Sequence, residues 1–173
     1  MGKLVKTLAV ASTAAVGALG LSLIKEHEGL RTSAYLDPVG IPTICYGHTG
    51  PEVRLGLKYT AAQCETILLQ DIAKHRKGLD RCVKTELNPN QWDALTSFAF
   101  NVGVSRACNS TMVRKINAGD LDGAAAEFPK WKYAGGRVLP GLVKRREHER
   151  LLFVKPYTCA PRDVKVTYNH LAE

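Results

Sequence analysis

The N-terminus of this 173-residue chain contains a long stretch without charge. Lys3 and Lys6 precede an uncharged run of 18 residues, from Thr7 to Ile24. As a helix the run would be about 27 Å long, close to the roughly 30 Å hydrocarbon core of a bilayer. A basic start followed by an apolar stretch is typical of segments that direct the rest of a chain across a membrane.

The composition of this run differs from that of a permanent anchor. Between Leu8 and Ile24, ten of seventeen residues are Ala, Gly, Ser or Thr, and only seven are Leu, Val or Ile. Small residues favour insertion into lipid only weakly. No small-x-small cleavage pattern follows Ile24, and Gly20-x-Ser22 is a poor one. Three interpretations remain open: a weak uncleaved anchor, a cleaved signal peptide, and an apolar helix in a cytosolic core.

Charge and cysteine content give further limits. The net charge is +8 and the pI about 9.4, which indicates an anionic partner or only a solubility feature. No nucleic-acid-binding motif accompanies the charge, so we expect no nucleic acid partner. The cysteines form no C-x-x-C pair, and their wide spacing suits disulfides in an oxidising compartment, with buried free thiols as the alternative. They are Cys45, Cys64, Cys82, Cys108 and Cys159.

The remaining chain predicts an α+β fold. Turn signals between residues 30 and 59 indicate a small antiparallel sheet. Thr60 and Gln63 form a capping box at the start of a helix, and Asn88-Pro89 starts the next, which ends near Gly103. Further helices are expected at 110–118, 121–132 and 140–154, and Pro129 is expected to kink or end the second of them. We predict three parts: an anchor segment at 1–24, a catalytic domain at 25–155 and a tail at 156–173.

Three polar residues stand at the ends of these expected elements. Glu28 ends the first helical segment, Asp37 begins a turn nine positions later, and Thr43 follows six positions further on. Cleavage of a glycosidic bond needs a protonated carboxyl beside the leaving oxygen, an ionised carboxylate on the other side of the sugar, and a positioned water. On residue types alone the trio is unremarkable, because each residue is common at its place.

Motifs in the surrounding sequence support a catalytic interpretation of these three residues. The pattern strongly resembles the phage lysozyme family, glycoside hydrolase family 24, over roughly residues 22 to 155. The matching motifs are Glu28-Gly29-Leu30-Arg31, Ala34-Tyr35-Leu36-Asp37, Thr43-Ile44-Cys45-Tyr46-Gly47-His48-Thr49, Ala99-Phe100-Asn101-Val102-Gly103, the stretch 110–120, Trp131-x-Tyr133-Ala134-Gly135-Gly136 and Gly141-Leu142-Val143-x-Arg145-Arg146-x-x-Glu149.

The resemblance implies a lysozyme-like fold, with a small antiparallel sheet lobe, a larger helical lobe and the active-site cleft between them. It implies Glu28 as general acid, Asp37 as the ionised partner and Thr43 as a residue that positions water, usually with inversion at the anomeric carbon. Asn101 is a candidate substrate-binding residue or a helix-terminus residue. No cofactor or metal is implied.

Further residues have two interpretations each. Arg145 and Arg146 either face the anionic peptide stems of a substrate or form a solvated basic face. We interpret His48 as structural, holding the two lobes together, although its side chain could titrate near neutral pH. The large aromatic residues are expected in the core rather than stacked on sugars. They are Trp92, Phe98, Phe100 and Trp131.

The resemblance also implies a biological setting. The expected substrate is the β-1,4 bond between N-acetylmuramic acid and N-acetylglucosamine in peptidoglycan. The chain would be a monomeric endolysin, first tethered inactive in the host inner membrane facing the periplasm, then soluble in the periplasm, acting together with a holin or pinholin. Among the three pairings open to four cysteines, we predict Cys45–Cys64 and Cys82–Cys108, with Cys159 unpaired or bridging two chains.

Two other function classes remain as alternatives. A lytic transglycosylase needs only one acid, because the 6-hydroxyl of the sugar replaces water, and the presence of both Asp37 and Thr43 argues against it. A basic, membrane-tethered protein without enzymatic activity would disrupt bilayers through the basic helix at 140–154.

Overall fold

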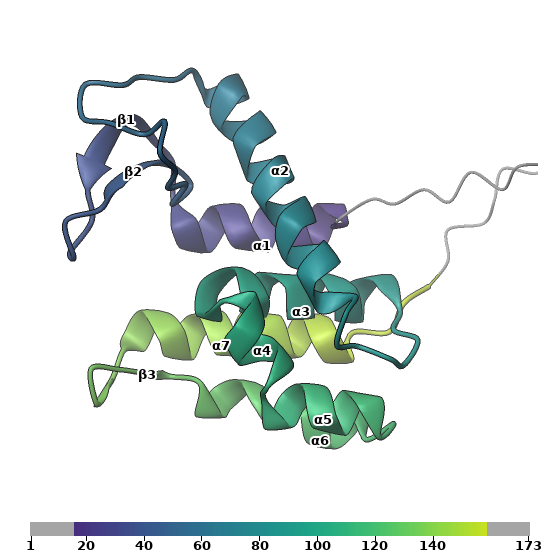
Figure 1. Ribbon diagram of the computed structural model, residues 1–173. Coiled ribbons are helices and arrows are strands. Elements are labelled where there is room, and N and C mark those ends of the chain that lie inside the picture. Colours follow the sequence, from purple (N-terminus) through teal and green to yellow (C-terminus); the bar gives the residue numbers. More distant parts are fainter. Residues whose placement is uncertain (1–15, 159–173) are drawn as a thin grey trace, which may run out of the picture.

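The computed structural model describes residues 16–158, drawn in colour in Figure 1. Most of the predicted anchor, the greater part of the tail and Cys159 lie outside the described residues. Within 16–158, the helices are too short or too polar to cross a bilayer.

The sheet lobe follows the first helix and consists of one antiparallel pair of strands. β1 (Arg31–Leu36) pairs with β2 (Pro42–Cys45), and Tyr35 lies opposite Thr43. The chain reverses at residues 37–41, where Gly40 has a φ of +82°, a conformation that favours glycine. A small core under these strands consists of Ile44, Cys45, Val53 and Cys64.

A long helix, α2 (Ala61–Leu79), connects this lobe to the rest of the molecule, as Figure 1 shows. The predicted capping box is present, because the Gln63 backbone N–H donates to Thr60 Oγ1 and the Thr60 backbone N–H donates to Gln63 Oε1. These bonds satisfy donors that the first turn of a helix otherwise leaves unpaired.

The helical lobe is built around α3 (Pro89–Val102), which packs against α1 (Ala18–Glu28), α2 and α7 (Pro140–Val154). Asn88 caps α3 and Gly103 ends it, as predicted. Phe98 is fully buried at its centre. Trp92 and Trp131 pack against the same core, and Phe100 lies against the cluster where α1 meets α2, so the expectation of core aromatics is confirmed.

Smaller elements complete the lobe. They are α4 (Val104–Cys108), α5 (Thr111–Asn117), α6 (Leu121–Ala125), the 3-10 helix η1 (Phe128–Lys130), β3 (Tyr133–Ala134) and β4 (Arg137–Val138). The helix expected at 121–132, with a kink or an end at Pro129, divides into α6 and η1, and Pro129 lies in the second piece. Proline lacks the donor and the space that a helix interior needs. The β3–β4 hairpin and α4 were not predicted.

Two disulfides join elements within these lobes, and both have the predicted pairing. Cys45–Cys64 links β2 to α2, and Cys82–Cys108 links the segment after α2 to the end of α4. The first therefore ties the sheet lobe to the long helix, and the second holds two segments of the helical lobe together.

Helix α1 crosses the division predicted at residue 24. It begins at Ala18, inside the uncharged run, and ends at Glu28. Gly20, Leu23 and Ile24 are buried, and Ile24 packs against Leu68 and Ile72 of α2. The last turns of the uncharged run are thus part of the folded body of the protein.

Candidate active site

Glu28 occupies the last position of α1, where the chain passes from the helical lobe to the sheet lobe. Gly29 follows with a φ of +69°, which lets the backbone leave the helix and enter β1. A side chain carbon on Gly47, which follows β2, would lie 3.6 Å from Glu28 Oε2. On the other side, Arg145 Nη1 of α7 donates to Glu28 Oε1 over 2.6 Å. The carboxyl group therefore lies between the two lobes.

Arg145 is itself held by a buried network. Its side chain is only 4% exposed, its Nε donates to Glu149 Oε1 over 3.1 Å, and its Nη2 donates to the backbone oxygen of Ser97 over 3.1 Å. Glu149 is fully buried and also pairs with Arg146 Nε at 2.8 Å. This network fixes the guanidinium of Arg145, and Arg145 in turn fixes the orientation of Glu28.

The arrangement changes the interpretation of both arginines. Arg145 and Arg146 are buried, so the alternative of a solvated basic face is wrong. These hydrogen bonds use three of the five N–H groups of the Arg145 guanidinium, which leaves two for another partner. Three charged residues of α7, Arg145, Arg146 and Glu149, thus form a buried ion-pair network that supports the site.

Asn101 stands at the rim of the same site. Its Oδ1 accepts a hydrogen bond from Arg146 Nη2 over 3.0 Å. A pocket of about 330 Å³ is lined by His27, Glu28, Asn101, Leu139, Gly141, Leu142 and Arg145. Glu28, Asn101 and Arg145, the candidates from three separate helices, therefore meet in one pocket.

Asp37 and Thr43 lie on the sheet-lobe hairpin and do not line that pocket. Asp37 Oδ1 accepts from the backbone N–H groups of Val39 and Ile41, over 2.9 and 2.8 Å. Thr43 is buried, and its hydroxyl donates to the backbone oxygen of Ile41 over 3.0 Å. Both candidate side chains are thus placed by hydrogen bonds of the turn that joins β1 to β2.

His48 ties this lobe to α2. Its Nδ1 lies 2.6 Å from Asp71 Oδ2, and its Nε2 lies 2.8 Å from Glu52 Oε1. Burial lowers the pKa of His48, but the hydrogen bonds to Glu52 and Asp71 outweigh it and raise the pKa above the ordinary value. These contacts link the sheet lobe to α2, and the structural role of His48 stays a prediction.

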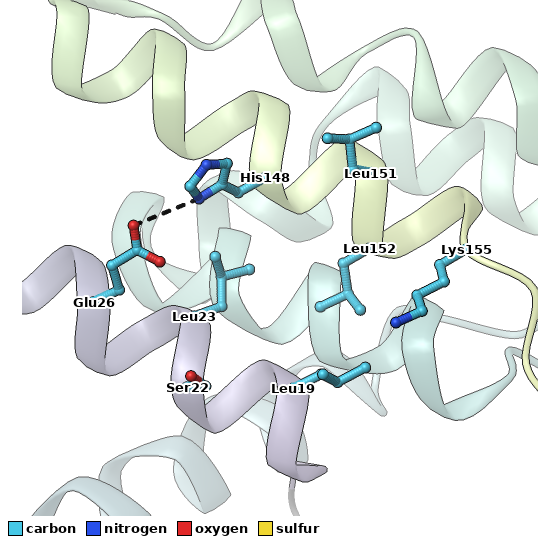
Figure 2. A pocket seen from close by; sticks show the side chains of 8 residues that line it. All are labelled: Leu19, Ser22, Leu23, Glu26, His148, Leu151, Leu152 and Lys155. Atoms are coloured by element: carbon cyan, nitrogen blue, oxygen red, sulfur yellow. Dashed lines mark ion pairs between the residues drawn. The ribbon is translucent and has the colours of Figure 1, made fainter.

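Two further histidines, His27 of α1 and His148 of α7, lie where these two helices meet, and His27 lines the pocket. Burial, reinforced by the charge of Arg145, lowers the pKa of His27 to about 4. Its ring lies 5.3 Å from that of His148, which is 3.9 Å from Glu26 Oε1, the ion pair that Figure 2 shows. The three side chains can bring ligand atoms within 4.8 Å of one another, but Lys144 already pairs with Glu26 at 3.0 Å. This positive charge disfavours a cation there.

Two residues of the site had no role assigned from sequence. Ser97 Oγ donates to Glu149 Oε1 over 2.9 Å, so both support Arg145. The spacing of Arg145 and Glu149, four positions apart on one helix, is a signal for a pair on one face. The contact of this pair with Glu28 and Ser97 depends on the packing of three helices, for which the sequence contains no local signal.

Solved structures similar to this chain include a muramidase domain and a lysozyme. The muramidase domain of SpmX from Asticaccaulis excentricus matches with a TM-score of 0.76 and 36% identity, covering 82% of this chain and 98% of that one. A mutant of P22 lysozyme matches with a TM-score of 0.74 and 36% identity, covering 81% and 98%. The fold is therefore that of a lysozyme.

The family model of phage lysozyme matches residues 25–149, and the chain belongs to this family. An endolysin of Acyrthosiphon pisum secondary endosymbiont phage 1 is 45% identical over 138 residues, which cover 78% of this chain and 94% of that protein. A SAR-endolysin of Bacteriophage PS119 is 42% identical, with 71% and 74% covered. An endolysin of Bacillus phage B103 is 43% identical, but this chain spans only about half, 52%, of its length.

Proposed function

We propose that this protein is an endolysin that hydrolyses the β-1,4 bond between N-acetylmuramic acid and N-acetylglucosamine in bacterial peptidoglycan. The observation that carries the proposal is the position of Glu28, between Gly47 of the sheet lobe and Arg145 of α7, in a chain of the phage lysozyme family. A carboxyl between two lobes is where the leaving oxygen of a bound glycan would lie.

The proposed reaction uses three side chains. Glu28 donates a proton to the glycosidic oxygen as the bond to the anomeric carbon breaks, and Asp37 takes a proton from the attacking water. The Thr43 hydroxyl donates its hydrogen bond to the backbone oxygen of Ile41, so its oxygen is free to accept a hydrogen bond from that water. Attack from the opposite side of the ring gives inversion.

The test is a turbidity assay on purified cell walls, with wild type beside Glu28→Gln. The amide cannot donate the proton, and general acid catalysis contributes roughly 10²–10⁴-fold, so we expect nearly all activity to be lost with the fold intact. The control is Glu26→Gln, an exposed position on the same helix, which should keep its activity. If Glu28→Gln retained more than about half the rate, the enzymatic assignment would fail, and a bilayer-disrupting protein would be favoured.

Mass spectrometry of the products separates hydrolysis from transglycosylation. Hydrolysis leaves reducing N-acetylmuramic acid ends, whereas attack by the 6-hydroxyl leaves anhydromuramyl ends. We expect reducing ends, because Asp37 and Thr43 both serve an attacking water.

We further infer that the N-terminal segment is an uncleaved anchor that tethers the enzyme inactive to the inner membrane, facing the periplasm, and later leaves the bilayer. SAR-endolysins are among the relatives, and the uncharged run contains few strongly apolar residues. Gly20, Leu23 and Ile24 of that run are buried in the domain as part of α1, which ends in Glu28. While these residues are in lipid, α1 cannot hold Glu28 in the cleft. A holin or pinholin would trigger release of the monomeric enzyme.

Two measurements test the tether. Edman sequencing of the soluble periplasmic protein should begin at or near Met1, and a start beyond Gly20 would instead indicate a cleaved signal peptide. Leucine at Ala14 and Ala15 should strengthen insertion and trap an inactive membrane form. Gly17 and Gly20 are unsuitable for this test, because a larger side chain there would also meet Asp93 in the folded domain.

A further inference from the structure

Helix α1 begins without a cap of its own. The N-cap residue is Gly17, which has no side chain to accept the unpaired N–H groups of the first turn. Asp93 of α3 accepts them instead: Oδ1 from the Gly17 N–H over 2.6 Å, and Oδ2 from the Gly20 N–H over 2.9 Å. Asp93 is only 4% exposed. A carboxylate at this end also interacts favourably with the helix dipole.

The contact requires glycine at both positions. A side chain carbon on Gly17 would lie 2.7 Å from Asp93 Oδ2. One on Gly20 would lie 2.7 Å from Asp93 Cγ and would also meet the side chain of Val16. Both distances are shorter than carbon atoms tolerate, and Asp93 is buried against α1, which leaves it little space to move. The two glycines therefore let the start of α1 approach α3 closely.

We propose that Asp93 binds the N-terminal segment after its release from the membrane, and that Asp93 is thereby a positioning residue for Glu28. Asp93 binds one end of α1, and Glu28 stands at the other end of the same 11-residue helix. Because a helix of this length moves as a unit, fixing its start fixes how far Glu28 reaches toward Gly47 and Arg145. The inference rests on the proposed tether and hydrolysis, and it gives Gly17 and Gly20 a role in the folded state as well as in the membrane.

The first test compares substitutions along α1 in the full chain, released in soluble form. Gly20→Ala should lower the rate of cell-wall hydrolysis per folded molecule by about tenfold or more, because small displacements of a catalytic group are costly. Ser22→Ala is the matched control, since it adds a similar apolar character to the segment at an exposed position and should keep the wild-type rate.

A double-substitution cycle separates positioning from general stability. Asp93→Ala should weaken docking of α1 by about tenfold, as loss of an N-cap does. Gly17→Ser alone should also be impaired, because its side chain meets Asp93. The combination of Asp93→Ala with Gly17→Ser removes that clash and gives α1 a local cap, so it should be more active than either single variant. If the two substitutions caused independent structural defects, the double variant would instead be less active than either single variant.

Hydrogen exchange gives a readout that does not depend on activity. The amides of Gly17 and Gly20 should exchange about tenfold faster in Asp93→Ala, whereas amides of α5 should be unchanged. If Asp93→Ala fails to fold, Gly20→Ala decides the question by the same measurement. If the wild-type protein hydrolyses cell walls, and Asp93→Ala and Gly20→Ala both show the wild-type exchange rates and activity, the inference is overturned. If the wild-type protein cannot hydrolyse cell walls, the proposed function is overturned instead.

Discussion

The two walls of the cleft are built in different ways. On the helical wall, Glu28 is held by Arg145, and Arg145 by Glu149 and Ser97, through contacts between residues 48 to 117 positions apart or within one helix. On the sheet wall, Asp37 and Thr43 are held by backbone groups at most four positions away. One wall depends on buried charge brought together by tertiary packing, and the other on the local geometry of a turn.

The difference indicates how each wall should respond to damage. Buried charges are stable only while paired, so removal of one member should destabilise the whole helical lobe. Turn hydrogen bonds near the surface have water as a substitute partner, so their loss should be tolerated by the fold while it disturbs the chemistry. The predictions below test this contrast in order of the expected effect on stability.

The largest effect is expected at Glu149. Glu149→Ala leaves Arg145 and Arg146 buried without their carboxylate, which should cost about 3–5 kcal/mol in the free energy of unfolding and abolish activity. Denaturant unfolding measures this directly. The control is Glu147→Ala on the same helix, whose ion pair with Arg150 lies at the surface and should contribute little to the free energy of unfolding. Equal losses for the two variants would mean that the buried ion pairs of the helical wall contribute no more to stability than a surface pair.

The disulfides should have the next largest effect. Their sequence separations of 19 and 26 residues correspond to about 3 kcal/mol each in the chain-entropy model. Replacing Cys45 and Cys64 by alanine should also lower activity, because that bridge ties β2 to α2. Replacing Cys82 and Cys108 should lower stability with activity preserved under native conditions. Unfolding curves and wall hydrolysis of both double variants test this, with Cys159→Ser as the control.

The sequence predicted the locally determined parts of the molecule well. The helix starts at Thr60 and Asn88 are set by side chains three residues away, and both were predicted from those residues. The turn position of Asp37 is equally local. The hairpin of β3 and β4 was not predicted although Gly135 and Gly136 mark its turn, because strands of two residues have no periodicity to detect.

The helical wall was predicted only in part, for a physical reason. The resemblance to a family supplied Glu28 and Arg145, but the roles of Glu149, Ser97 and Asp93 follow from contacts across helices far apart in sequence. Buried charged groups are also rare, so their residue types suggest the surface until their partners are known. Arg145 and Arg146 were therefore considered for a solvated face that the structure rules out.

Asp37→Asn should change stability little and activity much. The remaining oxygen of the amide can still accept from Val39 and Ile41, so we expect a loss of less than about 1 kcal/mol in the free energy of unfolding. The negative charge is lost, and wall hydrolysis should fall by about a hundredfold. Thr43→Ala should be impaired with its fold retained. Full activity of Asp37→Asn would mean that only the turn geometry, and not the charge, is needed.

The smallest effects are expected for two histidines, His48 and His27, whose pKa values shift in opposite directions. The pKa of His48 is raised, so the folded protein binds this proton more tightly than the unfolded chain does. The contribution of His48 to the free energy of unfolding is therefore full below the ordinary pKa of about 6.5 and is lost as the pH rises through the raised value. The pKa of His27 is lowered to about 4, so its contribution is present above about 6.5 and is lost as the pH falls toward 4. His48→Gln should therefore destabilise most at acidic pH, by roughly 0.5 kcal/mol for a partly exposed pair, and least at pH 9. His27→Gln should reduce the loss of stability between pH 6.5 and 4.

The test is to measure the free energy of unfolding from pH 4 to 9 for wild type and both variants. The difference between each variant and wild type gives the pH dependence that the histidine contributes. If this pH dependence had the same sign for His48 and His27, the assignment of His48 as a charged, ion-paired residue and of His27 as a buried neutral one would be refuted.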